Sequence, residues 1–147
     1  MIKNLNLITP LSLYFWYLDD GSLSVQKVKR KKSFFLRKQL TIALKSYSDK
    51  SILKLIDYLN SKYNLNFHKK MCKDKIGWIS LDTKTDIIKF LDLLKPYIDN
   101  LTPDSMIYKF CLCEIPQTRG ENFPNYNKCN CYETKICSCR NKNYNDY

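Results

Sequence analysis

The spacing of apolar residues along the chain predicts three long helices and a short one. The first helix opens at Thr9 and Pro10, because threonine caps helices well and proline suits the first helical position, and it ends at Asp20. A second helix is expected over residues 49–62, and a third ends near Pro96, since proline disfavours helical geometry in the residue before it. A short final helix is expected around residues 104–110.

Alternation of apolar and polar residues predicts two pairs of strands between these helices. Residues 22–26 alternate, and the apolar side chains of residues 36–45 share one parity, which indicates two half-buried strands joined as a hairpin. The lysine-rich residues 27–32 between them are expected to form a mobile basic loop. Residues 64–69 and 76–81 form a second pair of short strand-like runs, whose faces the pattern leaves open.

The resulting order is helix, strand, strand, helix, strand, strand, helix, followed by the short helix. This order is typical of the α+β class, with helices on one face of an antiparallel sheet. The other face of the sheet would be polar and basic, and it would either be solvated surface or lie in a DNA groove. Residues 1–110 are expected to form one domain, with residues 111–147 as a cysteine-rich tail.

The charge of the chain favours a polyanionic partner. The formal net charge is +11, with 21 lysines and 4 arginines, and residues 1–110 carry 20 basic and 10 acidic side chains. Such an excess indicates a nucleic acid rather than a small acidic molecule. Neither an apolar run of membrane-spanning length nor a signal-peptide core is found, so we expect an intracellular protein without a membrane partner. An organellar (mitochondrial or plastid), bacterial or viral origin is left open.

The end of the first helix carries the most informative chemistry. Residues 13–18 are apolar, and they run directly into Asp19, Asp20 and Gly21. Doubled negative charge is unfavourable at a helix C-terminus, so a positive group is expected there. Either the pair starts a turn, with Gly21 as a left-handed cap, or the carboxylates hold a hard divalent cation.

This motif and the order of elements resemble those of the LAGLIDADG homing endonucleases. The nine-residue motif corresponds to residues 13–21, in a form similar to the second motif of members that carry two. Residues 95–98 (Lys-Pro-Tyr-Ile) and 106–109 (Met-Ile-Tyr-Lys) agree as well, so the resemblance covers residues 9–110. It implies the αββαββα fold of that family, in which the antiparallel sheet forms a saddle.

The resemblance implies a site-specific DNA endonuclease that makes a double-strand break with divalent metal ions, as a dimer. Asp20 would be the metal-binding carboxylate, with Asp19 and Gly21 as further candidates for the metal site. The metal would be Mg²⁺ or Mn²⁺, because such ions activate water and neutralise phosphate charge. Lys109 corresponds to a lysine near the scissile phosphates, so it is a candidate catalytic residue together with Asp20.

Double-stranded DNA is the implied partner, and the first hairpin would make most of the contacts. Gln39, Thr41 and Lys45 correspond to positions that read bases in the major groove, where glutamine suits adenine and lysine suits guanine. The basic side chains nearby would mainly contact phosphates. The remaining candidates for DNA binding are Gln26, Lys27, Lys29, Arg30, Lys31, Lys32, Arg37 and Lys38.

The motif helix leaves the identity of the partner chain open. Tyr14, Phe15 and Trp16 are bulky, whereas many members of the resembling family carry small residues where two motif helices meet. The partner is either a second copy, giving a homodimer, or a complementary half-domain chain with a slimmer helix. Two other functions stay open on the same fold: a maturase that binds intron RNA, and a catalytically degenerate DNA-binding protein.

Six of the seven cysteines lie in the tail, within residues 111–139. Four of them form a C-x-C-x5-C-x-C array that suits tetrahedral coordination of a structural Zn²⁺: Cys129, Cys131, Cys137 and Cys139. The alternative is an unstructured tail with reduced, unliganded thiols, because this polar segment has little apolar surface to bury. Disulfides are not expected inside a cell.

Overall fold

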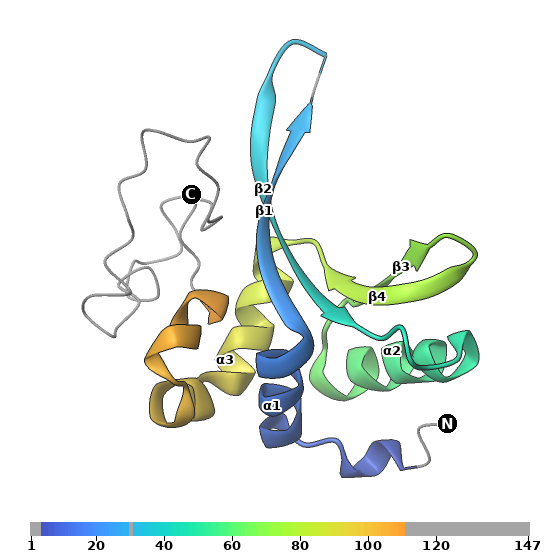
Figure 1. Ribbon diagram of the computed structural model, residues 1–147, viewed down its shortest axis with the longest axis vertical. Helices are drawn as coiled ribbons and strands as arrows, with labels where there is room; N and C mark the ends of the chain where they lie inside the picture. The colour runs from blue at the N-terminus through green and yellow to red at the C-terminus, as the bar shows by residue number, and fades with distance from the viewer. Residues whose placement is uncertain (1–3, 30, 111–147) are drawn as a thin grey trace.

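The computed structural model describes residues 4–29 and 31–110 (Figure 1). Its elements confirm the predicted α+β class and the αββαββα order, preceded and followed by short 3₁₀ helices. They are η1 (Leu5–Leu7), α1 (Pro10–Asp20), β1 (Gly21–Lys29), β2 (Phe34–Ala43), α2 (Asp49–Tyr63), β3 (His68–Cys72), β4 (Lys75–Leu81), α3 (Lys84–Leu101) and η2 (Asp104–Phe110). The cysteine-rich tail, with its four candidate zinc ligands, lies outside the described residues.

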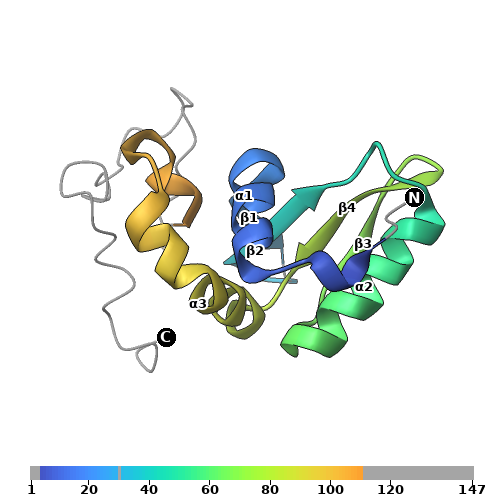
Figure 2. The same ribbon diagram turned by 90° about the horizontal axis from the view of Figure 1, so that it is seen from below.

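The four strands form one antiparallel sheet in the order β1-β2-β4-β3. The helices lie on one side of this sheet, and the long β1–β2 hairpin extends beyond them (Figures 1 and 2). We call the side opposite the helices the outer face. The sheet therefore has one face that the described helices cover, which contributes to the core, and an outer face that these helices leave uncovered.

The helix starts follow from local capping. Thr9 accepts a hydrogen bond from the Ser12 amide (3.2 Å), and the Ser12 hydroxyl accepts one from the Thr9 amide (2.8 Å), which closes a capping box at the start of α1. Ser48 and Thr83 cap α2 and α3, since their side chains accept hydrogen bonds from the amides of Ser51 and Asp86. Each of the three long helices therefore begins at a side-chain cap.

The core lies between the sheet and the helices. Leu40 and Ile42 of β2 face it, together with buried residues of all three α-helices. In α1, Tyr14 stacks on Phe110 with ring centroids 5.9 Å apart, and Tyr17 packs against Phe90 at 5.6 Å. Aromatic packing thus joins α1 to α3 and to η2.

The predicted basic loop over residues 27–32 is wrong in its first half. β1 continues to Lys29 and β2 begins at Phe34, so residues 27–29 belong to the sheet. Lys27 pairs with Leu36 and Lys29 with Phe34, and this ladder satisfies the backbone whatever the side chains are. A lysine-rich sequence indicates that a segment is exposed to solvent, but it does not distinguish a loop from an exposed strand.

The predicted strand over residues 64–69 is wrong over residues 64–67, because β3 begins only at His68. Asn64 adopts a left-handed conformation with φ 51°, which ends α2 and turns the chain. The side chain of Asn60 then bridges the amide and the carbonyl of Phe67, so these backbone groups are bonded to a side chain rather than to a strand. Phe67 is buried as a core residue of the connection.

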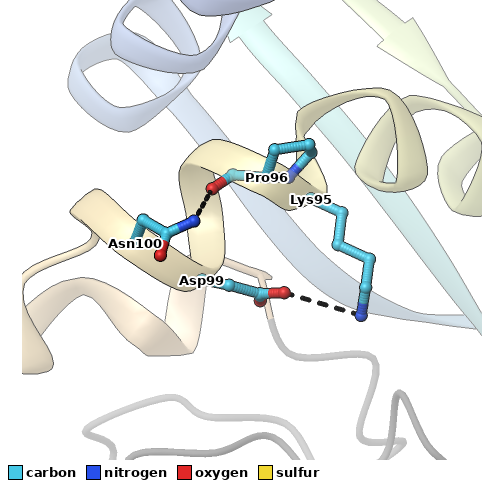
Figure 3. Close-up of polar contacts among 4 residues, drawn as sticks. All are labelled: Lys95, Pro96, Asp99 and Asn100. Atoms are coloured by element: carbon cyan, nitrogen blue, oxygen red, sulfur yellow. Dashed lines mark hydrogen bonds and ion pairs between the residues drawn. The ribbon is translucent and has the colours of Figure 1, made fainter.

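The third helix does not end near Pro96, contrary to the prediction. α3 continues to Leu101 with Pro96 inside it, and Figure 3 shows this segment. Asn100 donates a hydrogen bond to the Pro96 carbonyl (2.6 Å), and Lys95 pairs with Asp99 at 3.6 Å (Figure 3). Proline removes one backbone donor, whereas burial of Ile98 beyond it favours continuing the helix. Across the described residues, no helix is long and apolar enough to cross a membrane.

Candidate active site

The C-terminal end of α1 presents two adjacent carboxylates at the surface. Asp19 and Asp20 are exposed, and Gly21, the first residue of β1, is buried. Gly21 has φ −86° and ψ 154°, so the interpretation of this residue as a left-handed cap is wrong. A Cβ atom here would lie 2.1 Å from Cδ2 of Tyr17 and 2.3 Å from the Tyr17 carbonyl oxygen. The glycine is required by close approach of the chain to α1, which places the carboxylates where the helix meets the sheet.

The positive charge expected at this helix end comes from Lys109 in η2. Its ammonium donates hydrogen bonds to the carbonyls of Leu18 (2.6 Å) and Asp19 (3.3 Å). The Tyr17 hydroxyl donates in turn to the Lys109 carbonyl (2.7 Å). A cation on the last carbonyls of a helix compensates the negative end of its dipole. Lys109 and the carboxylates are therefore brought together, although 90 residues separate Lys109 from Asp19 in the sequence.

Burial and the neighbouring carboxylates shift the pKa of Lys109 in opposite directions, and burial has the larger effect. Partial burial lowers the pKa of Lys109 below its ordinary value, while the charges of Asp19 and then Asp20 raise it. The ammonium has three donors, and two of them reach the helix carbonyls. The third donor is positioned at the same end of α1 as the two carboxylates.

Replacement of Asp19 by asparagine is expected to lower the pKa of Lys109 further. Asp19 is the stronger of the two carboxylate influences that oppose the effect of burial, so its removal leaves burial less compensated. An NMR titration that follows the Lys109 side chain would measure the change. Asp57→Asn, at an exposed carboxylate of α2, should leave the titration of Lys109 unchanged. A rise in the pKa of Lys109 in the Asp19 variant would contradict this assignment.

The donor set at the end of α1 fits a hard divalent cation. Carboxylate oxygens are ligands that Mg²⁺ and Mn²⁺ accept, and both side chains are open to solvent. Within the described residues, however, no group of three His, Cys, Asp or Glu side chains is placed to hold a metal ion. One chain thus offers a two-carboxylate half-site, which water or a second molecule would have to complete.

Of the bulky residues Tyr14, Phe15 and Trp16 in the motif helix, Phe15 is the most exposed. Tyr14 is fully buried and shares a hydrogen bond with Thr102 (3.0 Å), and Trp16 packs against the core. Phe15 is 54% exposed, and Leu11, one turn earlier, is exposed as well. With Asp19 one turn later, these side chains share one face of α1 at a spacing of four residues.

The three predicted base-reading residues, Gln39, Thr41 and Lys45, differ in their exposure and in their place relative to β2. Thr41 is half-buried on the outer face, and Gln39 on the same face is only 5% exposed. Lys45 lies beyond the end of β2 rather than in the strand, with its ammonium 4.7 Å from the centroid of the Trp78 ring. Thr41 and Lys45 are thus accessible on this side, whereas Gln39 is covered.

The predicted phosphate-contacting residues lie mainly along the projecting hairpin. Lys29, Lys31 and Lys32 are exposed near its tip, and Arg30 lies outside the described residues. In β2, Arg37 lies on the same face of the sheet as Gln39, whereas Lys38 lies on the opposite face with Leu40. These two predicted DNA contacts therefore lie on different faces of the sheet. Gln26 and Lys27 are paired in β1.

Sequence reasoning missed three residues of the outer face: Lys70, Trp78 and Asp82. Lys70 donates a hydrogen bond to the side-chain carbonyl of Gln39 (2.7 Å), and the Gln39 amide group donates to Asp82. The bulge between Lys70 and Met71 interrupts the alternation of β3, which is why the sequence pattern did not assign its faces. The alternation in β4, which places Ile79 and Leu81 in the core, could have indicated that Trp78 lies on the outer face.

Comparison with known proteins relates this chain to a family of DNA endonucleases. A model of the LAGLIDADG DNA endonuclease family matches residues 1–87. The probable intron-encoded endonuclease 1 of Wickerhamomyces canadensis is 35% identical over 94 residues, covering 64% of this chain and 38% of that protein. The protein RecA of Mycolicibacterium flavescens is 26% identical over 119 residues, covering 80% of this chain and 26% of that protein.

A solved structure is similar as well. The homing endonuclease I-WcaI bound to its DNA recognition sequence aligns with a TM-score of 0.55 and 33% identity, over 72% of this chain and 42% of that chain. The chain therefore spans less than half the length of each of these three relatives.

Proposed function

The chain belongs to the LAGLIDADG DNA endonuclease family, and from this premise we propose that it cleaves double-stranded DNA at a specific sequence. The observation that carries the proposal is the exposed pair Asp19 and Asp20 beside the ammonium of Lys109, where α1 meets the sheet. The related homing endonuclease I-WcaI is bound to its DNA recognition sequence, which supports duplex DNA as the substrate. The net charge of +11 supports the same partner.

In this proposal the residues at the end of α1 have separate tasks. Asp20 would hold Mg²⁺ or Mn²⁺ through its carboxylate, and Asp19 and the backbone of Gly21 would belong to the same site. A bound divalent ion supplies charge neutralisation at the scissile phosphate and an activated water. Lys109 fixes the helix end and directs its third donor toward a phosphate oxygen, where a cation stabilises developing negative charge.

A second copy of this domain completes the half-site. The two α1 helices would meet along the face formed by Leu11 and Phe15, which brings the carboxylates of both copies together, one for each DNA strand. Tyr14 does not obstruct this contact, because it is fully buried in its own domain, and Trp16 is partly buried against the same core. A homodimer is the first candidate, and a complementary half-domain chain is the alternative partner.

Phe15→Glu is expected to separate the dimer, because it places a charge on each side of an apolar seam. Light scattering after size exclusion should give twice the chain mass of 17.5 kDa for the parent and a single chain mass for the variant. Leu53→Glu, at an exposed apolar residue of α2, should leave the dimer intact. A monomeric parent that cuts both strands would contradict the shared site.

A selection experiment tests the substrate. The full chain, in EDTA, is offered a pool of randomised duplexes together with a pool of structured RNA. We expect one duplex sequence to be enriched, and that duplex to be cut when Mg²⁺ is added. If the RNA displaces the duplexes and no duplex sequence is enriched, the proposal fails in favour of a maturase that binds intron RNA.

A further inference from the structure

Gln39 is a polar side chain on the outer face of the sheet that is bonded at both ends of its amide group. It is 5% exposed, although it lies on the side of β2 opposite the helices. Its amide nitrogen donates to the carboxylate of Asp82, just after β4, and its carbonyl accepts a hydrogen bond from Lys70 in β3 (2.7 Å). One amide thus joins β2 to β3 and to the residue that follows β4.

The chemistry of the two partners fixes the orientation of this amide. The Asp82 carboxylate only accepts hydrogen bonds and the Lys70 ammonium only donates them, so an inverted amide would meet a mismatch at both ends. Both bonds involve a charged group, which makes them stronger than bonds between neutral groups. A glutamine reads adenine with one donor and one acceptor, and in Gln39 both of these are already bonded within the chain.

Lys70 is in the opposite situation. It is half-buried, and one of its three donors reaches Gln39, which fixes the position of the ammonium without using its whole capacity. In the major groove, guanine presents two adjacent acceptors, O6 and N7, which suit a lysine donor. Cytosine presents a donor there, which a lysine cannot accept.

From these contacts we propose that Lys70 is a specificity-determining residue that contacts a guanine, and that Gln39, held by Asp82, is the positioning residue for Lys70. The proposal rests on the proposed function, and it revises the sequence-based assignment of Gln39 to adenine. Asp82 acts on Lys70 through Gln39, whose amide group donates a hydrogen bond to its carboxylate.

The same duplex selection tests the proposal with three variants of the full chain. Lys70→Met and Gln39→Met should each reduce the preference for guanine, by about tenfold, at one and the same base pair of the selected sequence. Lys69→Met is the matched control: it removes the same charge from the neighbouring exposed position and should keep the preference. Thermal unfolding shows which variants are folded, and Lys70→Met decides the question if Gln39→Met unfolds.

Two results would overturn the proposal while leaving the endonuclease assignment in place. In the first, Lys70→Met keeps the selected sequence, and Gln39→Met loses a preference for adenine. In the second, Lys70→Met weakens all duplexes alike and reduces the salt dependence, as expected for a phosphate contact. If the parent enriches no duplex at all, the proposed function fails, and the assignment of Lys70 fails with it.

Discussion

Gly21→Ala is expected to destabilise the protein by at least about 3 kcal/mol, at the upper end of what overpacking costs. The added Cβ would lie 2.3 Å from the backbone oxygen of Tyr17 and 2.1 Å from its ring. Rotation of the ring cannot relieve the contact with the oxygen, so α1 and β1 would have to separate. Chemical denaturation of parent and variant measures the change in the free energy of unfolding.

Ser22→Ala is the matched control for this prediction, because it changes the next residue of β1 at an exposed position. It should alter the free energy of unfolding by only about 0.5 kcal/mol or less. Equal stability of the parent and the Gly21 variant would show that the close approach of α1 to β1 is not needed. The position of the carboxylates relative to the sheet would then not depend on this contact.

Asp20→Asn is expected to reduce the rate of DNA cleavage by about a thousandfold or more. The substitution keeps the size of the side chain and removes the charge that binds a divalent ion. Loss of several kcal/mol of transition-state stabilisation corresponds to a rate effect of this size. Binding of the duplex should persist or strengthen, because the variant carries one negative charge fewer near the phosphates. Single-turnover cleavage and equilibrium binding on the same duplex separate the two effects.

Asp57→Asn makes the same chemical change at an exposed carboxylate of α2, so it should cleave like the parent. The folded state is not expected to depend on Asp20, whose side chain is exposed. A variant that fails to bind as well as to cut would indicate a structural role, in conflict with the assignment of Asp20 as a metal ligand.

The fold could be predicted from the sequence because periodicity reports burial. The order of elements and the end of α1 at Asp20 follow from apolar spacing and from strong caps such as Thr9. The errors arise where tertiary contacts override a local signal. Helix α3 continues past Pro96 because residues on both sides of the proline are buried in the core. At Phe67, the side chain of Asn60 bonds the backbone groups that a strand would have paired.

The candidate site was predictable in part. The doubled carboxylate required a positive neighbour, and Lys109 provides it, but its bonds to the helix carbonyls depend on the packing of η2 against α1. The sequence suggests that a glycine is needed at position 21 for a left-handed backbone conformation. In the structure the backbone there is extended, and glycine is needed because Tyr17 lies too close for a Cβ atom. The engagement of Gln39 by Lys70 could not be predicted, because it connects residues 31 positions apart across a bulged strand.

We propose that the C-terminal ends of two paired α1 helices form a divalent-metal nuclease site for duplex DNA. The most direct test is incubation of the full chain with a plasmid library of randomised sites, with Mg²⁺ or with EDTA, followed by recovery of linear DNA. We expect linear products that share one sequence in the presence of Mg²⁺, and no linear products in EDTA. Linear products that persist in EDTA, or tight binding of RNA with no linear DNA at any Mg²⁺ concentration, would contradict it.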